Sequence, residues 1–402
     1  MRTPFTPAFI LLSFFGYSQS NWTQVEAYDG FVRHHPVTFS IDGFGYLLTG
    51  RATFGDLADF WRYDPVEDSW EKLPDFPGGA RGFSYGVAHQ GKAYVGFGLT
   101  QTGAPLNLAD LWEYDPATES WRELSRCPGL PRHHPAFVAL NGKLFVGLGG
   151  NLSLGDLKDW WVYDIATDTW EKKSDLPASA RHHPFYFGIG DYVYAGMGHS
   201  GPIIFDDLYR YDLSTDTWEE MASIPGQGRV AGTQFDYQGE GYVLGGQNEQ
   251  HQNFPVGEFW KYTPETNSWT ELEAFPFGSR WAPGSFRIDN LLFFTSGEDN
   301  IGGFNNDVWM FDLGGTVDDD EIIQLEDRLD LFPNPVSSIL QVDLSNADLD
   351  LATANVYDTN GKLILSTEIN NGTISVAALP VGVYKLVLEH EEKVFVESFV
   401  KL

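Results

Sequence analysis

Apolar and aromatic residues recur along residues 21–313 in one pattern that repeats about every 50 residues. Each copy consists of an acid, an apolar residue, an aromatic residue, a variable residue and a second aromatic residue, as in Asp59-Phe60-Trp61-Arg62-Tyr63. The six copies begin at Asp59, Asp110, Asp159, Asp207, Glu258 and Asp307, and their final aromatic residues are 51, 49, 48, 51 and 49 positions apart. Short alternating stretches of this kind predict β-strands with one buried face.

A tryptophan and an arginine extend the repeat. The tryptophan follows the final aromatic residue by seven positions in the first five copies, and the arginine follows that tryptophan by eleven. The sixth copy lacks the tryptophan, whereas Trp22 and Arg33 near the N-terminus again stand eleven residues apart. We therefore predict that the N-terminal strand completes the last repeat and closes a ring of sheets without an open edge.

Glycine doublets accompany the aromatic pairs, with complete copies at Gly149-Gly150 and Gly245-Gly246. A period near 50 with these features resembles the kelch repeat, in which each copy is one four-stranded blade of a β-propeller. The resemblance implies an all-β fold with a six-bladed kelch-type β-propeller over residues 21–313, closed by the N-terminal strand. The four strand types are expected at stretches such as 136–141, 143–150, 110–115 and 120–125. The repeated tryptophan and tyrosine side chains are predicted to pack between blades.

The C-terminal part has a different pattern. Residues 314–328 contain glycines and a run of acids, which predicts an acidic linker. Residues 329–402 alternate between apolar and polar positions, and Asn360-Gly361 between two apolar runs predicts a tight hairpin in a small β-sandwich.

This C-terminal segment resembles the sorting domain of the type IX secretion system of Bacteroidetes. The matching residues are Pro333-Asn334-Pro335, Val356-Tyr357-Asp358, Gly361-Lys362, Leu379-Pro380, Gly382-Val383-Tyr384 and Phe399-Val400-Lys401. The resemblance implies the type IX secretion machinery as a partner. It also implies passage through the periplasm, followed by release or attachment at the cell surface, usually with removal of this domain. An Ig-like adhesive module is the alternative.

Residues 1–20 are expected to be a secretory signal peptide. Arg2 supplies positive charge, the apolar run from Ala8 to Phe15 is too short to span a bilayer, and small residues follow at Gly16 and Ser18. No later segment has the length and apolar character of a transmembrane helix. We therefore expect a secreted or cell-surface protein.

Charge and cysteine content narrow the classes of partner. The formal net charge of -31 repels phosphate backbones and anionic lipids, so nucleic acid is not an expected partner. The single cysteine, Cys127, excludes internal disulfides and zinc ribbons. Neutral glycans, cationic partners and Ca²⁺ remain compatible with this charge.

The tetrapeptide Arg-His-His-Pro occurs three times, beginning at Arg33, Arg132 and Arg181, each time just before a predicted innermost strand. In a four-stranded meander, the connections before the first strand and between the second and third strands lie on one face of the ring. The latter connections vary in sequence, and variable loops on a rigid scaffold commonly carry binding residues. Eight of the ten histidines fall on this face. With one tryptophan they are the candidate ligand-binding residues: His34, His35, His133, His134, His182, His183, His199, His251 and Trp281.

Three interpretations of the histidine pairs stay open: rings that fill space near the axis, a polar pocket for a sugar or peptide, and a metal site. Neighbouring residues of a strand point to opposite faces, so each pair is expected to send one ring toward the central channel. Metal ligands must converge, and blades 1, 3 and 4, which carry the pairs, are not all adjacent. No cofactor is therefore predicted, although a His-bound metal, or Ca²⁺ at Glu298-Asp299-Asn300, stays open. Binding through histidines should change between about pH 5 and 8.

Six arginines begin the innermost strands, and six acids begin the third strands. Because a buried guanidinium needs a carboxylate partner, we interpret these arginines as structural. They are Arg33, Arg81, Arg132, Arg181, Arg229 and Arg280. In kelch proteins, arginines at this rim also bind acidic ligands.

Some kelch propellers are enzymes. The galactose oxidase type needs copper, two tyrosines, two histidines and a cysteine cross-linked to tyrosine, and Cys127 has no matching tyrosine here. A sialic acid mutarotase of six-bladed form would need an acid and an arginine in its pocket, and no phosphate loop or HExxH motif is present. We expect a binding module for glycan or protein, with no catalytic residue assigned. A carbohydrate-acting enzyme of the mutarotase or epimerase type in the same pocket, and a structural part of a surface assembly, are the alternatives.

Overall fold

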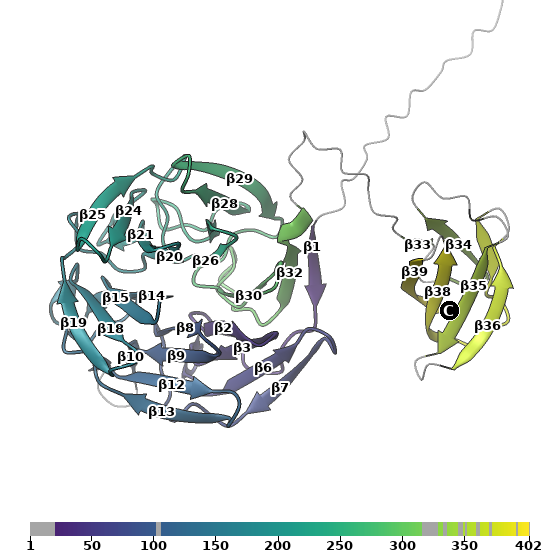
Figure 1. Cartoon of the computed structure of the whole chain (residues 1–402), viewed down its shortest axis with the longest axis horizontal. Coiled ribbons are helices and arrows are strands. Elements are labelled where there is room, and N and C mark those ends of the chain that lie inside the picture. The colour runs from purple at the N-terminus through teal and green to yellow at the C-terminus, as the bar shows by residue number, and fades with distance from the viewer. Residues whose placement is uncertain are drawn as a thin grey trace, which may run out of the picture. The chain divides into compact units, whose positions relative to one another are not determined.

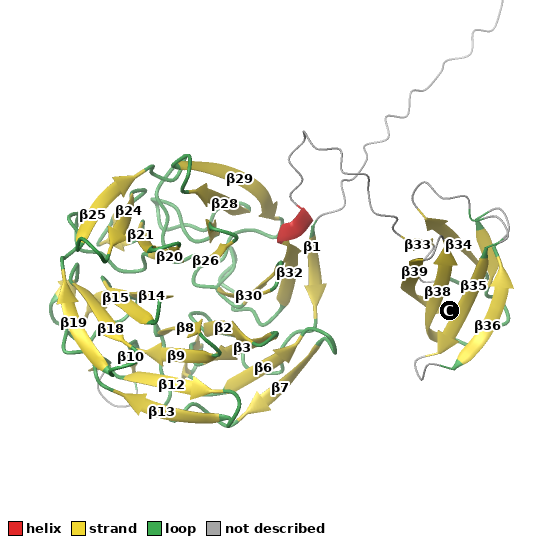
Figure 2. Cartoon of the chain, in the orientation of Figure 1, coloured by secondary structure: helices red, strands yellow, loops and turns green. Residues whose placement is uncertain are grey.

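The computed structural model describes residues 21–101, 106–315 and 329–401, the last range with gaps at 333–335, 345–348, 350–351, 359–361, 370–371 and 391–392. The predicted signal peptide at 1–20 lies outside the described residues, as does the predicted linker from residue 316 onward. Contacts divide the chain into two units, residues 1–316 and 317–402, and each is described by itself. Figure 2 shows that strands and loops make up both units, with one short 3-10 helix, η1 (Leu313–Gly315).

The repeated apolar and aromatic stretches form four-stranded antiparallel sheets, one for each blade. Blade 1 contains β2 (Val37–Ile41), β3 (Phe44–Leu48), β6 (Phe60–Asp64) and β7 (Ser69–Leu73). Blade 2 contains β8 (Tyr85–His89), β9 (Lys92–Gly96), β12 (Leu111–Asp115) and β13 (Ser120–Leu124). Blade 3 contains β14 (Ala136–Leu140), β15 (Lys143–Gly147), β18 (Trp160–Asp164) and β19 (Thr169–Lys173).

The second half of the propeller continues this order. Blade 4 contains β20 (Phe185–Ile189), β21 (Tyr192–Gly196), β24 (Leu208–Asp212) and β25 (Thr217–Met221). Blade 5 contains β26 (Thr233–Tyr237), β27 (Glu240–Leu244), β28 (Gly257–Thr263) and β29 (Ser268–Phe275). Blade 6 contains β30 (Gly284–Ile288), β31 (Leu291–Thr295), β32 (Val308–Asp312) and, from the N-terminus, β1 (Trp22–Val25).

The ring closes through β1, as the sequence predicts. β1 pairs antiparallel with β32, with Trp22 opposite Phe311 and Val25 opposite Val308. The Trp22 ring packs 5.0 Å from Phe275 and 4.9 Å from Phe311. The innermost strands β2, β8, β14, β20, β26 and β30 surround the axis, and β2 contacts both β8 and β30 (Figure 1). β32 is therefore paired on both sides, as the third strand of every other blade is.

Aromatic side chains of the repeat lie between blades. Phe60 of blade 1 meets Tyr114 of blade 2 at 5.0 Å between ring centroids, and Trp160 of blade 3 meets Trp218 of blade 4 at 5.0 Å. Trp160 is fully buried. The prediction that these rings form the core of the propeller is confirmed, and it removes most of them from consideration as ligand contacts.

The second unit is a small β-sandwich. One sheet contains β33 (Leu329–Phe332), β34 (Ile339–Leu344) and β37 (Thr373–Ser375). The other contains β36 (Leu363–Glu368), β35 (Thr353–Asp358), β38 (Gly382–His390) and β39 (Lys393–Lys401). Buried side chains of both sheets, among them Leu340, Val356 and Phe399, form one core. β35 and β36 pair as the predicted hairpin requires, while Asn360-Gly361 themselves lie outside the described residues.

Candidate functional site

The histidine pairs stand where two kinds of connection meet on one face of the propeller. Short hairpins follow the second strand in four blades: β4 (Arg51–Ala52) with β5 (Gly55–Asp56), β10 (Leu99–Thr100) with β11 (Leu106–Asn107), β16 (Gly150–Asn151) with β17 (Gly155–Asp156), and β22 (His199–Ser200) with β23 (Ile203–Ile204). Single β-bridges join each histidine pair to such a hairpin, for example His182 to His199. We call this side the histidine face.

The six arginines are held in structural pairs. Each guanidinium contacts the acid at the start of the third strand of its own blade: Arg33–Asp59, Arg81–Asp110, Arg132–Asp159, Arg181–Asp207, Arg229–Glu258 and Arg280–Asp307. Arg132 donates to both Asp159 oxygens at 2.8 and 2.7 Å, and to the backbone carbonyl of Leu148 at 3.0 Å. Burial raises the pKa of Asp159, but the hydrogen bonds and charge of Arg132 outweigh it and leave that pKa below its usual value.

The residue two positions after each arginine has a left-handed backbone. The φ angles are 51° at His35, 62° at Phe83, 49° at His134, 52° at His183, 53° at Ala231 and 50° at Ala282. Left-handed conformations are rare for residues with side chains, so their presence in all six blades marks a constraint of the ring. The expectation that strand alternation decides which ring faces the channel is therefore corrected. The second histidine of each pair reaches the axis because the chain turns there, before the strand begins.

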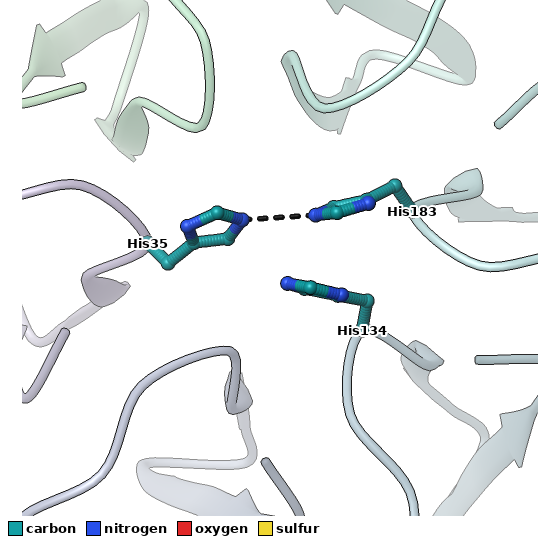
Figure 3. A group of neighbouring side chains, drawn as sticks. All are labelled: His35, His134 and His183. Atoms are coloured by element: carbon teal, nitrogen blue, oxygen red, sulfur yellow. Dashed lines mark hydrogen bonds between the residues drawn. The ribbon is translucent and has the colours of Figure 1, made fainter. Parts of the chain in front are cut away.

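Three imidazole rings meet at the axis (Figure 3). The Nε2 atoms of His35 and His183 are 2.9 Å apart, and the His134 ring stacks on His183 at 3.4 Å between centroids. One nitrogen of each of the three rings lies within 4.8 Å of the other two. Blades 1, 3 and 4 are not all adjacent, yet their second histidines come together because all blades approach one another at the axis. We call these residues the axial triad.

Phe83 of blade 2 fills the space beside the axial triad. Its ring centroid lies 4.6 Å from that of His35 and 4.5 Å from that of His134. Aligning the repeats places Phe83 at the same position as these histidines, so the sequence contained a signal for it. The triad is thus enclosed by an aromatic ring on one side.

Burial lowers the pKa of five histidines on this face. The pKa values of His35, His134 and His183 lie well below 6.5, first because the rings are buried and then because neighbouring imidazoles oppose a second charge. Burial also lowers the pKa to about 3 at His34 and to about 4 at His133. The expected change in binding between pH 5 and 8 therefore does not follow from these five rings, which stay neutral throughout that range.

His134 has the fewest hydrogen-bond partners of the three rings. Neither of its nitrogens has a hydrogen-bond partner among the described residues, although its side chain is buried. A buried polar atom without a partner costs about 1–3 kcal/mol. The axial triad therefore contains hydrogen-bonding capacity that the protein itself does not use.

A pocket opens beside the triad on the histidine face. The cavity has a volume of about 410 Å³ and is lined by His182, His183, His199, Val230, Gln247, His251, Trp281 and Glu298. His182 Nδ1 lies 2.6 Å from the Asp156 carboxylate, and the His199 ring lies 5.1 Å from His251. Five of the nine predicted ligand-binding residues line this cavity, and the other four lie deeper or in neighbouring blades. Asp156 and Gln247 were not predicted, and Glu298 was named only as part of a possible Ca²⁺ segment.

A second cavity of about 390 Å³ lies along the innermost strands. His35 is among its lining residues, and it also contains Tyr85, Tyr186, Asp236 and Arg287. Because His35 lines this channel and His183 lines the pocket, the axial triad separates the two cavities. An acid and an arginine thus occur together in the channel, whereas no arginine is found among the described residues that line the pocket.

Exposed apolar side chains gather on the histidine face. Among the described propeller residues, the exposed large hydrophobic side chains in its connections are Phe31, Val32, Phe54, Leu106, Leu130, Leu152, Leu154, Ile203, Val256, Phe277 and Ile301. The opposite face has one, Val66. We call the eleven residues the apolar rim. Exposed apolar surface concentrated on one face is typical of an interaction surface, and this feature was not predicted from the sequence.

Comparison with known families adds two matches. Residues 242–276 match the family model of the Kelch motif, and residues 330–402 match that of the Secretion system C-terminal sorting domain. The chain therefore contains a Kelch motif in blade 5 and a secretion sorting domain at its C-terminal end. Type IX secretion therefore takes this kelch propeller to the extracellular side or the cell surface. Separately, no helix in the described part of the chain has the length and apolar character needed to cross a membrane.

Curated relatives match parts of the chain. N-acetylneuraminate epimerase of Haemophilus influenzae (strain PittEE) is 30% identical over 173 residues, which cover 32% of this chain and 46% of the relative. A putative F-box/kelch-repeat protein of Arabidopsis thaliana is 34% identical over 96 residues, or 22% of this chain and 28% of the relative. N-acetylneuraminate epimerase of Salmonella arizonae is 32% identical over 120 residues, or 28% and 30%. The chain spans less than half the length of each relative.

The lone cysteine is remote from this chemistry. Cys127 is buried in the core between blades 2 and 3, and burial raises the pKa of its thiol to about 11. A protonated, buried thiol is a poor nucleophile and metal ligand.

Proposed function

We propose that the exported kelch propeller binds a carbohydrate through the histidine face, with a sugar unit in the pocket beside Trp281. The observation that carries this proposal is the lining of that pocket. It combines an indole ring with a carboxylate, an amide and several imidazoles in a cavity of about 410 Å³. Ligand sites of this size commonly join an aromatic wall to a few polar groups that set orientation.

The chemistry of the lining suits a neutral sugar. A pyranose has an apolar C–H face that packs on an aromatic ring, and hydroxyl groups that exchange hydrogen bonds with groups such as Glu298 and Gln247. A negatively charged sugar would meet the Glu298 carboxylate and a chain of net charge -31, with no arginine in the described lining to offset them. The N-acetylneuraminate epimerases named above support carbohydrate as the class of ligand, and not any particular sugar.

The apolar rim favours a sugar that belongs to a larger partner. A single sugar unit fills the pocket and leaves the rim untouched, whereas a polysaccharide or glycoprotein would reach Phe54 and Leu154, which are 66% and 64% exposed. Burying such side chains on binding contributes roughly 25 cal/mol per Å² of apolar area. We therefore expect longer ligands to bind more tightly than free sugars.

Binding of the mature protein to an array of neutral oligosaccharides and polysaccharides tests the proposal. Trp281→Ala should weaken binding of any array hit tenfold or more while the melting temperature stays close to that of the wild type, and Trp281→Phe should retain part of the affinity. Phe54→Ser should weaken polysaccharide binding without affecting a short oligosaccharide. Val66→Ser, on the opposite face, is the matched control and should change neither.

Two outcomes would contradict the proposal. Absence of any neutral carbohydrate hit would favour a structural part of a surface assembly. Turnover of a bound sugar that survives Trp281→Ala would favour an enzyme that uses another cavity, such as the channel with Asp236 and Arg287.

A further inference from the structure

We propose that the axial triad of His35, His134 and His183 binds one divalent transition metal ion, such as Zn²⁺, at the propeller axis. Three neutral imidazoles suit Zn²⁺, Cu²⁺ and Ni²⁺, whereas Ca²⁺ and Mg²⁺ prefer oxygen ligands. The inference does not rest on the proposed carbohydrate, because the ligands belong to the triad and not to Trp281 or Glu298.

The spacing of the ring nitrogens is close to what one ion requires. Two nitrogens bound to a tetrahedral Zn²⁺ at about 2.0–2.1 Å lie roughly 3.3 Å apart. His35 Nε2 and His183 Nε2 are 2.9 Å apart, and a His134 nitrogen lies within 4.8 Å of both. In Figure 3 the His134 and His183 rings lie one over the other and turn the same ends toward His35. Small movements of all three rings would place one nitrogen of each around a single ion.

The hydrogen bonds on the far side of His183 leave a lone pair on its axial nitrogen, which faces His35 Nε2 at 2.9 Å. His199 Nδ1 faces the carbonyl oxygen of Gly201 at 3.3 Å, so this nitrogen carries the proton and His199 Nε2 is an acceptor. His183 Nδ1 lies 3.3 Å from His199 Nε2 and therefore donates to it. His183 Nε2 then presents a lone pair to the axis. A metal-bound histidine commonly donates its second N–H to such a partner.

His134 provides the second, independent observation. It is a buried ring that has no hydrogen-bond partner for either nitrogen within the described residues, and it is placed against two other imidazoles. At the equivalent positions of blades 5 and 6 the chain uses Ala231 and Ala282, so the fold tolerates apolar residues here. Packing alone does not require three imidazoles at this point.

One positive charge near the axis, that of Arg51, opposes a cation at His35. Its guanidinium is offset by the Asp56 carboxylate at 2.8 Å and lies over the Phe83 ring at 4.1 Å. A second carboxylate, that of Asp156, contacts His182, the residue before His183.

Zinc titration of the untagged mature protein, freed of metals by a chelator, tests this site. Calorimetry should show one Zn²⁺ per chain and a rise in melting temperature. The Co²⁺-loaded protein should show the visible absorption of tetrahedral nitrogen ligation. His134→Ala and His35→Ala should each weaken zinc binding at least a hundredfold, and His89→Ala, a histidine away from this face, should leave it unchanged.

His199→Ala distinguishes the triad from the neighbouring group of His182, His183 and His199, whose nitrogens also lie within 4.8 Å of one another. For the axial triad, His199 only supports His183, so zinc binding should weaken about tenfold. Loss of zinc binding in His199→Ala with retention in His134→Ala would overturn the proposal. So would a wild-type protein that binds no Zn²⁺, a result that does not depend on how any variant folds. The carbohydrate array, which probes Trp281, would be unaffected by either failure.

Discussion

Arg132, His133 and His134 are consecutive residues with three different environments. The arginine is fully buried and bound to Asp159 and a backbone carbonyl. His133 accepts a hydrogen bond at Nδ1 from the Asn107 amide at 2.7 Å, and His134 lies at the axis without a partner in the described structure. Scaffold and candidate site are thus separated by one residue along the chain, because the backbone turns left-handed after the bridge at His133.

The arginine–acid pairs predict unequal losses in the free energy of unfolding when the acid of a pair is replaced. Asp159→Asn leaves a buried guanidinium without its carboxylate and should lower the free energy of unfolding by about 3 kcal/mol. Glu258→Gln should cost less, because Arg229 makes one hydrogen bond of 3.0 Å to Glu258 and its Nε and Nη1 atoms lack partners within the described residues. Chemical denaturation of both variants measures the difference. Equal losses below about 0.5 kcal/mol, typical of surface pairs, would contradict the structural interpretation.

The buried histidines predict a loss of stability in mild acid. The pKa of His34 is about 3 and that of His133 about 4, against 6.5 for an unfolded chain. Between these values the unfolded state binds protons that the folded state does not. The stabilising contribution is therefore complete above pH 6.5 and falls as the pH drops toward 4, by about 2 kcal/mol at pH 5 for His34 alone.

Denaturation of the wild type and of His34→Gln at pH 7.5, 6 and 5 measures this effect, and the variant should show the smaller loss. The pKa values of Asp59 and Asp159 are lowered, so these carboxylates change stability only below about pH 4, where carboxylates protonate. They therefore do not affect the comparison between pH 7.5 and 5. Stability that stays constant from pH 7.5 to 5 would show that these rings are hydrated.

Among the elements, β1 carries the closure of the ring. It is the one outer strand that reaches its blade from the opposite end of the propeller sequence, and Trp22 anchors it among Phe259, Phe275, Phe294 and Phe311. Trp22→Ala should lower the free energy of unfolding by about 3–5 kcal/mol and speed hydrogen exchange in β32. Trp121→Ala on β13 is the matched control, because β13 stays tethered to β12 by a short turn. Unchanged exchange in β32 after Trp22→Ala would contradict closure by β1.

The strands could be predicted from the sequence because each repeat encodes them locally. The stretch 136–141 predicts β14, 143–150 predicts β15, and the spacing of Trp22 from Arg33 predicts the pairing of β1 with β32. The axial geometry could not be predicted in the same way. Alternation along a strand says nothing of a left-handed residue before it, and whether His35, His134 and His183 touch depends on the radius of the closed ring.

At the scale of the whole propeller, the histidine face differs from the opposite face. Eight histidines, the pocket and the apolar rim lie on the histidine face, while the turns on the opposite face expose Val66 alone among large hydrophobic residues of the described propeller. Variable loops in the sequence indicated which face binds. The rim itself was missed because exposed leucines and phenylalanines in separate loops look unrelated until the ring brings them to one side.

The central claim is that the closed ring brings His35, His134 and His183 from separate blades to one metal-binding point below the pocket. Diffraction from crystals of the mature protein grown with Zn²⁺, measured at the zinc absorption edge, tests it most directly. The account predicts one anomalous peak on the propeller axis, about 2.0–2.1 Å from a ring nitrogen of each residue. A peak held by His182 and His199 instead, or no peak within the ring, would contradict it.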